Sequence, residues 1–267
     1  MAELLRANVL VHLRFFRRNR LLLAVGLIFF GFLGLSLLMT SLMSTLGGRF
    51  RTMQMLSSQL GGSVRFFVPA LGLVLIWSHQ KDRNLKMVVT KPCTPEVWLL
   101  SGLTAAGAIS AAFHVAVFIL MVVLALAFGI PFQSGFGFLA MESFLSSLIA
   151  LTYLSLLTTL FHPVVALLFL SIFNDGTLQS LSMAAEVGAT SHPGSAFFAV
   201  LAYASHALSW IPPMFHPFGN RYAAVASSLR TTGGDWLTLL ASAGYAALAA
   251  TLFFLLMVLA LRRKPLM

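Results

Sequence analysis

Few residues of this 267-residue chain have the types and spacing that catalysis requires. The seven histidines are scattered, and the sequence contains neither H-E-x-x-H nor G-x-S-x-G, the patterns of zinc proteases and serine hydrolases. No glycine precedes a lysine, so the phosphate-binding pattern G-x-x-x-x-G-K-[ST] is also missing. We therefore expect no catalytic residue, no resident cofactor and no ATPase activity in this chain.

Three ionisable residues in or beside apolar segments are the candidates to line a pathway across a membrane: His114, Glu142 and Asp175. Titratable groups inside a bilayer are costly and mark functional positions by default. Each also has a purely structural alternative. His114 can hydrogen-bond a neighbouring helix, Glu142 can pair with Arg65 near the outer face, and Asp175 can lie in a plain loop.

Methionine and histidine residues raise a copper alternative, because thioether and imidazole ligands suit Cu(I). Met39 and Met43 are one helical turn apart, and the other candidates are spread along the chain: Met53, Met55, Met214 and His216. Methionine is also ordinary packing material. We therefore predict no metal site and keep copper handling as an alternative.

The composition identifies the environment in which these residues act. Hydrophobic residues make up 59% of the chain and charged residues 9%, whereas a soluble domain is roughly 25% charged. The net charge of +10 would suggest nucleic acid, but the basic residues stand at the ends of apolar runs. We therefore predict an all-α integral membrane protein that contacts the lipid bilayer and binds no nucleic acid.

Six apolar segments approach the ~20 residues that a membrane-spanning helix needs: 21–46, 64–78, 101–130, 136–161, 164–185 and 237–261. The fifth spans only if it continues through Asn174-Asp175-Gly176. Residues 196–211 predict a further helix, which dips into the outer face within a re-entrant segment of about 190–220. The alternative is a seventh span, which would put the two termini on opposite sides.

Residues 1–20 predict an amphipathic helix in the membrane interface, ahead of a six-helix domain that covers residues 21–267. Most of its charged residues share one face, and the apolar ones fill the other: Leu4, Leu5, Val9, Val11, Leu13, Phe15 and Phe16. The helix is either a simple anchor or an elbow that transmits motion. Lysine and arginine concentrate on one side of this six-span arrangement, which predicts that both termini are cytoplasmic.

The inner connection between the second and third spans, residues 79–97, is long and mixed in character. Residues 84–91 can form two turns of helix, and Pro92 ends them because the residue before a proline disfavours helix. A short helix facing the cytosol is what docking to a cytosolic partner requires. The alternative is a solvated basic loop.

This connection contains the run KDRNLKMVVTKPCTPEVWLLSG, which resembles the cytoplasmic loop of ABC-2-type transporter permeases. Asp82-Arg83 matches the acidic–Arg pair of that loop, and Lys91-Pro92 matches its Lys-Pro. Residues 84–86 depart from the pattern, because small residues usually follow the acidic–Arg pair. The amphipathic start, the six spans and the proline-bearing outer segment 211–220 extend the resemblance over nearly the whole chain.

The resemblance implies the permease subunit of an ABC exporter in the bacterial inner membrane. Such a subunit pairs with a second permease, as a homodimer or heterodimer, and with cytosolic ATP-binding subunits that bind the ATP. The residues implied to contact the ATP-binding subunit are Asp82, Arg83, Leu85, Met87, Val88, Lys91 and Pro92. The alternatives are an ATP-independent secondary transporter, which would need charges near the membrane midplane, and a membrane assembly factor.

Overall fold

The computed structural model describes residues 2–18, 20, 24, 31, 34–35, 68, 71–74, 76, 94–127, 129, 133–172, 175–191, 195–208 and 213–263. All regular secondary structure in these ranges is helical, which confirms the predicted all-α class. The predicted first and second spans lie largely outside the described residues. The seven predicted ATPase-contacting residues, 82–92, lie wholly outside them.

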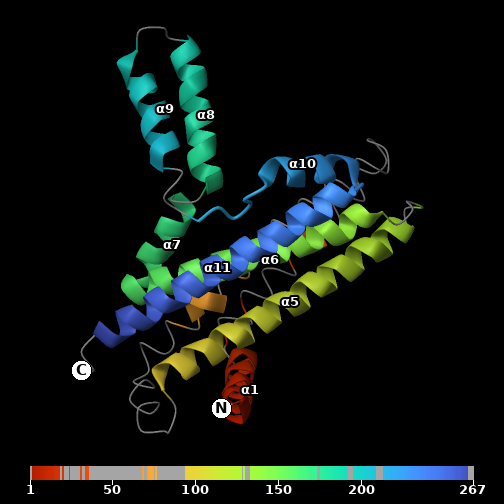
Figure 1. Cartoon of the computed structure of the whole chain (residues 1–267), viewed down its shortest axis with the longest axis vertical. Helices are drawn as coiled ribbons and strands as arrows, with labels where there is room; N and C mark the ends of the chain where they lie inside the picture. The colour runs from red at the N-terminus through yellow and green to blue at the C-terminus, as the bar shows by residue number, and fades with distance from the viewer. Residues whose placement is uncertain are drawn as a thin grey trace.

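Three helices are long and apolar enough to cross a membrane: α5 (Pro95–Ala127), α6 (Ser134–Leu160) and α11 (Gly233–Arg263). They match the predicted third, fourth and sixth spans and identify a membrane protein. The shortest has 27 residues, about 40 Å at 1.5 Å per residue, against a hydrocarbon layer of about 30 Å. Figure 1 shows the three helices packed side by side.

The starts of α5 and α11 extend beyond the apolar runs, and a polar residue caps each of them. Thr94 Oγ1 accepts from the Val97 N–H at 3.4 Å, and Pro95 occupies the first helical position, where its missing N–H costs nothing. Helix α5 therefore begins within the predicted connection 79–97, ahead of the predicted third span at residue 101. At the start of α11, the Asp235 carboxylate accepts from both the N–H and the hydroxyl of Thr232 at 2.7 Å.

Contacts at the helix ends fix the directions in which the three helices run. Arg262 near the end of α11 contacts Glu96 at the start of α5 at 2.7 Å. Thr231, just before α11, donates to Ser134 at the start of α6 at 2.7 Å. Helix α5 is therefore antiparallel to both α6 and α11, which run parallel to each other.

Helix α6 is the central element of this bundle. In the most apolar stretch of each helix, 67% of α6 is buried, against 28% of α5 and 22% of α11. Its buried apolar residues pack against those of α5 and α11, and they include Phe136, Phe138, Leu139, Leu151 and Leu156. Polar residues on α6 must therefore find their partners inside the protein.

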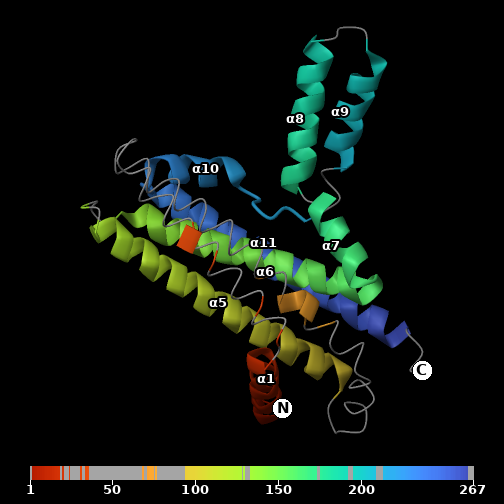
Figure 2. The ribbon, with the colours of Figure 1, turned by 180° about the vertical axis from the view of Figure 1, so that it is seen from behind.

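Helix α1 (Ala2–Arg18) packs across α5, and both views show it beneath that helix (Figures 1 and 2). Its most buried side chains are His12 and Phe16, and the His12 ring lies 4.2 Å from that of Trp98. Leu4 and Val11, which were predicted on the apolar face, are exposed. Val9, Leu13 and Phe15 are partly buried against the same core, so the packed face of α1 covers part of the predicted apolar arc.

The predicted fifth span, residues 164–185, carries two described helices, α7 (Pro163–Ile172) and α8 (Asp175–Ser191). Residues 173–174 lie outside the described residues, and a crossing by this segment stays a prediction. Aspartate favours a helix start and glycine disfavours a helix interior, so a new helix begins at Asp175. Helix α8 pairs with α9 (Ala196–Leu208), the predicted outer helix, and Figures 1 and 2 show this hairpin extending away from the bundle.

Helix α10 (Gly219–Ser228) returns the chain to the bundle and ends in a tight contact with α6. Leu229 is buried and adopts a left-handed conformation at φ 57°. Its carbonyl accepts from the N–H of Gly135 at 3.0 Å. A Cβ atom on residue 135 would lie 2.2 Å from the same carbonyl oxygen, so this position requires glycine.

We predict that Gly135→Ala destabilises the protein, because the added Cβ must displace backbone rather than a flexible side chain. The expected loss is about 1–3 kcal/mol of unfolding free energy. Gly137→Ala is the matched control: its Cβ would meet only the Trp236 ring at 4.0 Å, and alanine favours helix by about 1 kcal/mol. Thermal unfolding in detergent, followed by circular dichroism, measures both. Equal melting temperatures for the two variants would contradict the contact.

Candidate functional site: a polar network inside the bundle

A row of buried hydroxyl side chains follows the length of α6: Ser143, Ser146, Ser147, Thr152, Ser155, Thr158 and Thr159. Most of them donate to a backbone carbonyl one turn earlier, at 2.7–2.9 Å, and so satisfy themselves within the helix. Ser143 and Ser146 differ, because their recorded partners are histidine rings from other parts of the chain. These two serines mark the site.

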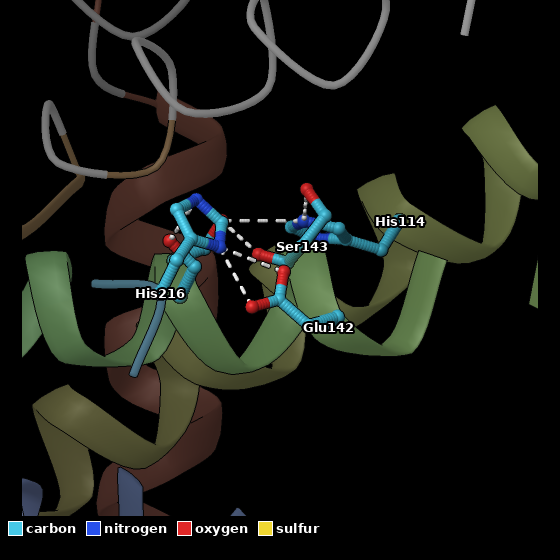
Figure 3. A network of polar contacts seen from close by, with 6 residues as sticks. His114, Glu142, Ser143 and His216 are labelled. Carbon is cyan, nitrogen blue, oxygen red and sulfur yellow. Dashed lines mark hydrogen bonds and ion pairs between the residues drawn. The ribbon is translucent and has the colours of Figure 1, made fainter. Parts of the chain in front are cut away.

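Glu142 on α6 pairs with His216, which lies in the non-helical connection between α9 and α10. The His216 Nδ1–H donates to both carboxylate oxygens, at 2.7 and 2.9 Å (Figure 3). Glu142 is 4% exposed, so its carboxylate depends on this partner for the hydration that it has lost. The sequence suggested Arg65 as the partner; Arg65 lies outside the described residues, and the contact in the structure is with His216.

The second ring nitrogen of His216 faces Ser146, one helical turn beyond Glu142. The Ser146 Oγ lies 3.5 Å from Nε2, a long contact. Because Nδ1 carries the proton given to Glu142, Nε2 of the neutral ring accepts from the Ser146 hydroxyl; the protonated ring would instead donate to it. Glu142, His216 and Ser146 thus form a chain of hydrogen bonds in which protons can be exchanged.

His114 on α5 reaches the same face of α6. Its Nδ1–H donates to the Ser110 carbonyl at 2.8 Å, since a carbonyl only accepts. Its Nε2 lies 3.2 Å from Ser147 Oγ and 3.4 Å from Ser143 Oγ. The Ser147 hydroxyl donates to the Ser143 carbonyl, so the Ser143 hydroxyl is the donor left for Nε2. His114 therefore links two helices, as its structural alternative required; a role in a pathway stays a prediction.

The two histidines approach α6 from different elements, and Figure 3 shows both rings beside the segment that carries Glu142 and Ser143. Glu142 and Ser146 are four residues apart, as are Ser143 and Ser147, so a single turn of α6 presents them together. That spacing was visible in the sequence and indicates a polar face. The role of His216 was missed, since its sequence position suggested only a copper ligand.

The connection that carries His216 is held by other contacts besides the Glu142 pair. The Met214 N–H donates to the Tyr245 hydroxyl at 2.9 Å. This bond satisfies a backbone donor that would otherwise have been satisfied within a helix. The Phe215 ring lies 6.4 Å from that of Tyr153, and the His216 ring lies 5.0 Å from that of Tyr222. Non-helical backbone that packs against a bundle needs such protein partners for its polar groups.

Glu142, His216 and Ser146 have the hydrogen-bond order of a serine hydrolase triad. An acyl-transfer site also needs free N–H donors for the oxyanion. Ser146 lies in the interior of α6, where the backbone N–H groups bond within the helix. Helix α6 itself therefore offers no free backbone N–H beside Ser146 for an oxyanion.

The remaining site candidates are placed only in part. Asp175 begins α8, away from the polar network, and its side chain lies outside the described residues. His114 and Glu142 are brought to one face of α6, so two of the three pathway candidates meet. Over the described residues, no group of three or more histidine, cysteine, aspartate or glutamate side chains could hold a metal ion.

No protein-family model matches the chain, and no curated protein matches it. The fold and the site define a helical membrane protein with a polar face buried at the centre of its bundle. Its function is inferred from its residues and their geometry.

Proposed function

We propose that the chain is the permease subunit of an ABC transporter, forming a translocation path and coupled to a separate ATP-binding subunit. It would work as a homodimer or heterodimer of permeases, in the export direction, in the bacterial inner membrane. The proposal combines the ABC-2-type resemblance of loop 79–97 with the membrane-protein fold. The observation that carries it is that the start of α5 contacts both α1 and α11.

Helix α5 begins three residues after Pro92, at the end of the proposed coupling loop. Its first turns contact two other elements: Trp98 packs against His12 of α1, and Glu96 bonds Arg262 of α11. A force on the loop would therefore reach α1, α5 and α11 together. Such a junction is suited to convert docking of a cytosolic subunit into movement of the bundle, with α1 as the elbow.

The helix directions support six spans rather than seven. Helices α6 and α11 run parallel, so residues 161–232 must return across the membrane an odd number of times if both helices span it. One crossing by the α7–α8 segment, with α9 dipping into the outer face, meets this requirement. A seventh span through α9 would make the number even. The odd number also fits two cytoplasmic termini.

A proton-driven secondary transporter is the second candidate, and one observation favours it. Such a transporter needs ionisable groups within the membrane, and the Glu142–His216 pair lies inside the bundle, eight residues from the start of α6. The two candidates differ in their need for an ATP-binding partner.

We predict that Arg83→Glu weakens recovery of the ATP-binding subunit by about tenfold when the permease is purified in mild detergent. A guanidinium that contacts a partner carboxylate becomes repulsive when its charge is reversed, and 1.4 kcal/mol corresponds to a factor of ten. Arg49→Glu, the same change in the predicted outer loop, is the matched control and should leave recovery unchanged.

Two results would count against the permease proposal. One is the absence of any Walker-motif protein in the wild-type preparation, with transport surviving ATP depletion; this would favour the secondary transporter. The other is equal recovery of the ATP-binding subunit with Arg83→Glu and with Arg49→Glu, which would remove Arg83 from its role.

The only cysteine of the chain, Cys93, tests the side on which the coupling loop lies. We predict that a membrane-impermeant maleimide labels Cys93 in inverted membrane vesicles and leaves it unlabelled in intact cells. An Arg49→Cys variant in a Cys93→Ser background should behave in the opposite way. Labelling of Cys93 in intact cells would put the loop outside, where no cytosolic ATP-binding subunit can reach it.

A further inference from the structure

The protonation of the pair formed by Glu142 and His216 matters for the bundle independently of any coupling to ATP. Glu142 lies eight residues into α6, about 12 Å along the helix axis. That depth is inside the hydrocarbon layer of a bilayer, which begins within a few ångströms of the ends of a spanning helix. A lone charge there is disfavoured, so the number of protons on the pair decides whether it is stable.

The reference state of the pair is an ionised carboxylate beside a neutral imidazole, and the pair can take up one or two further protons. With one further proton, a carboxylate faces an imidazolium and the pair has no net charge. A further proton converts the carboxylate to a carboxylic acid and leaves an unbalanced imidazolium. Because the two groups are in direct contact at 2.7 Å, a proton on one changes the net charge that the other faces.

The pair also joins parts of the protein that have few other links. Helix α9 packs chiefly against α8, and this hairpin extends away from the bundle (Figures 1 and 2). After α9 the chain returns to the bundle through residues 213–218, which His216 fastens to α6. Other contacts of this segment among the described residues include the Met214–Tyr245 bond, the packing of Phe215 and the ring contact between His216 and Tyr222.

We propose that Glu142, His216 and Ser146 form a proton-binding site inside the bundle, and that binding of a second proton releases residues 213–218 from α6. Ser146 supports the site because its hydroxyl donates to the neutral ring and accepts from the protonated one. Release of the segment frees the end of the α8–α9 hairpin that leads back to the bundle. Proton binding and hairpin position are then linked, and each biases the other.

The other titratable or charged side chains that face this site from the described elements are few. They are His114 on α5, Tyr153 on α6, Arg221 and Tyr222 on α10, and Asp235 and Tyr245 on α11. Arg221 and Asp235 lie 3.7 Å apart and balance each other. His114 is the other histidine of this set, so the test must separate it from the pair.

The test measures the distance from the hairpin to the bundle by pulsed electron spin resonance on the purified full-length chain in lipid nanodiscs. Spin labels are attached through Tyr203→Cys on α9 and Leu248→Cys on α11, both at well-exposed positions, in a Cys93→Ser background. We expect one distance at pH 8 and a second, longer distance at pH 5, with the released fraction rising about tenfold.

Two variants test whether the response comes from the pair, and a third variant is the control. Glu142→Gln leaves no carboxylate to balance an imidazolium, so the first proton should already release the segment, and the longer distance should appear at a higher pH than in the wild type. His216→Gln, which keeps an amide donor for the carboxylate, should lose the pH response. Glu186→Gln, an exposed carboxylate on α8, is the control and should respond like the wild type. His114 is intact in all three, so a response due to His114 would survive in them.

A wild-type distance distribution that is the same at pH 5 and pH 8 would overturn the proposal. A full wild-type pH response in His216→Gln would overturn it as well. This second comparison holds even if Glu142→Gln cannot be purified. The experiment uses the permease chain alone. Failure of the ATP-binding subunit to co-purify would therefore overturn the proposed function and leave this inference standing.

Discussion

The structure depends on how a carboxylate is accommodated inside an apolar bundle. Helix α6 is the most buried of the three long helices, and Glu142 points into the protein rather than toward lipid or water. A buried charge without a partner costs several kcal/mol. The cost is met by His216, which is brought in by a non-helical connection. The position of residues 213–218 thus follows from the charge on α6.

The same requirement explains the rest of the polar face. Hydroxyl side chains of α6 that lack an imidazole partner turn back to their own helix, whereas Ser143 and Ser146 face histidines from α5 and from the connection. Helix packing in membranes gains little from apolar contact, because lipid is equally apolar, so interhelical hydrogen bonds and close packing have a larger share. The histidines therefore serve as links between elements as well as titratable groups.

Much of the fold could be predicted from the sequence because long apolar runs have a single stable solution in a bilayer. The runs that became α5, α6 and α11 are of this kind, and Thr94-Pro95 marks one helix start. The interruption of the fifth segment at Asn174-Asp175-Gly176 could also be seen in the sequence, but apolar length alone could not tell whether the segment continues through it. Exposure of Leu4 and Val11 on α1 depends on how α5 crosses that helix, which periodicity cannot give.

The site was predicted less completely than the fold, for a physical reason. His114 and Glu142 were found because titratable residues stand out in apolar runs. Their partners could not be found in that way: His216 is 74 residues from Glu142 and lies in a connection with no helical period. Serine is an ordinary residue in membrane helices, so Ser143 and Ser146 gain meaning only when the imidazoles are placed. The coupling residues 82–92 lie outside the described part of the chain and remain a prediction from resemblance.

The most direct measurement is a double-mutant cycle on the unfolding free energy, with Glu142→Leu, His216→Phe and the two combined, in mixed micelles titrated with denaturing detergent. If the imidazole holds the buried carboxylate, each single change removes the same interaction. The double variant should then lose about 1–3 kcal/mol less than the sum of the single losses. Losses that simply add would mean that Glu142 and His216 do not support each other, and would contradict the account.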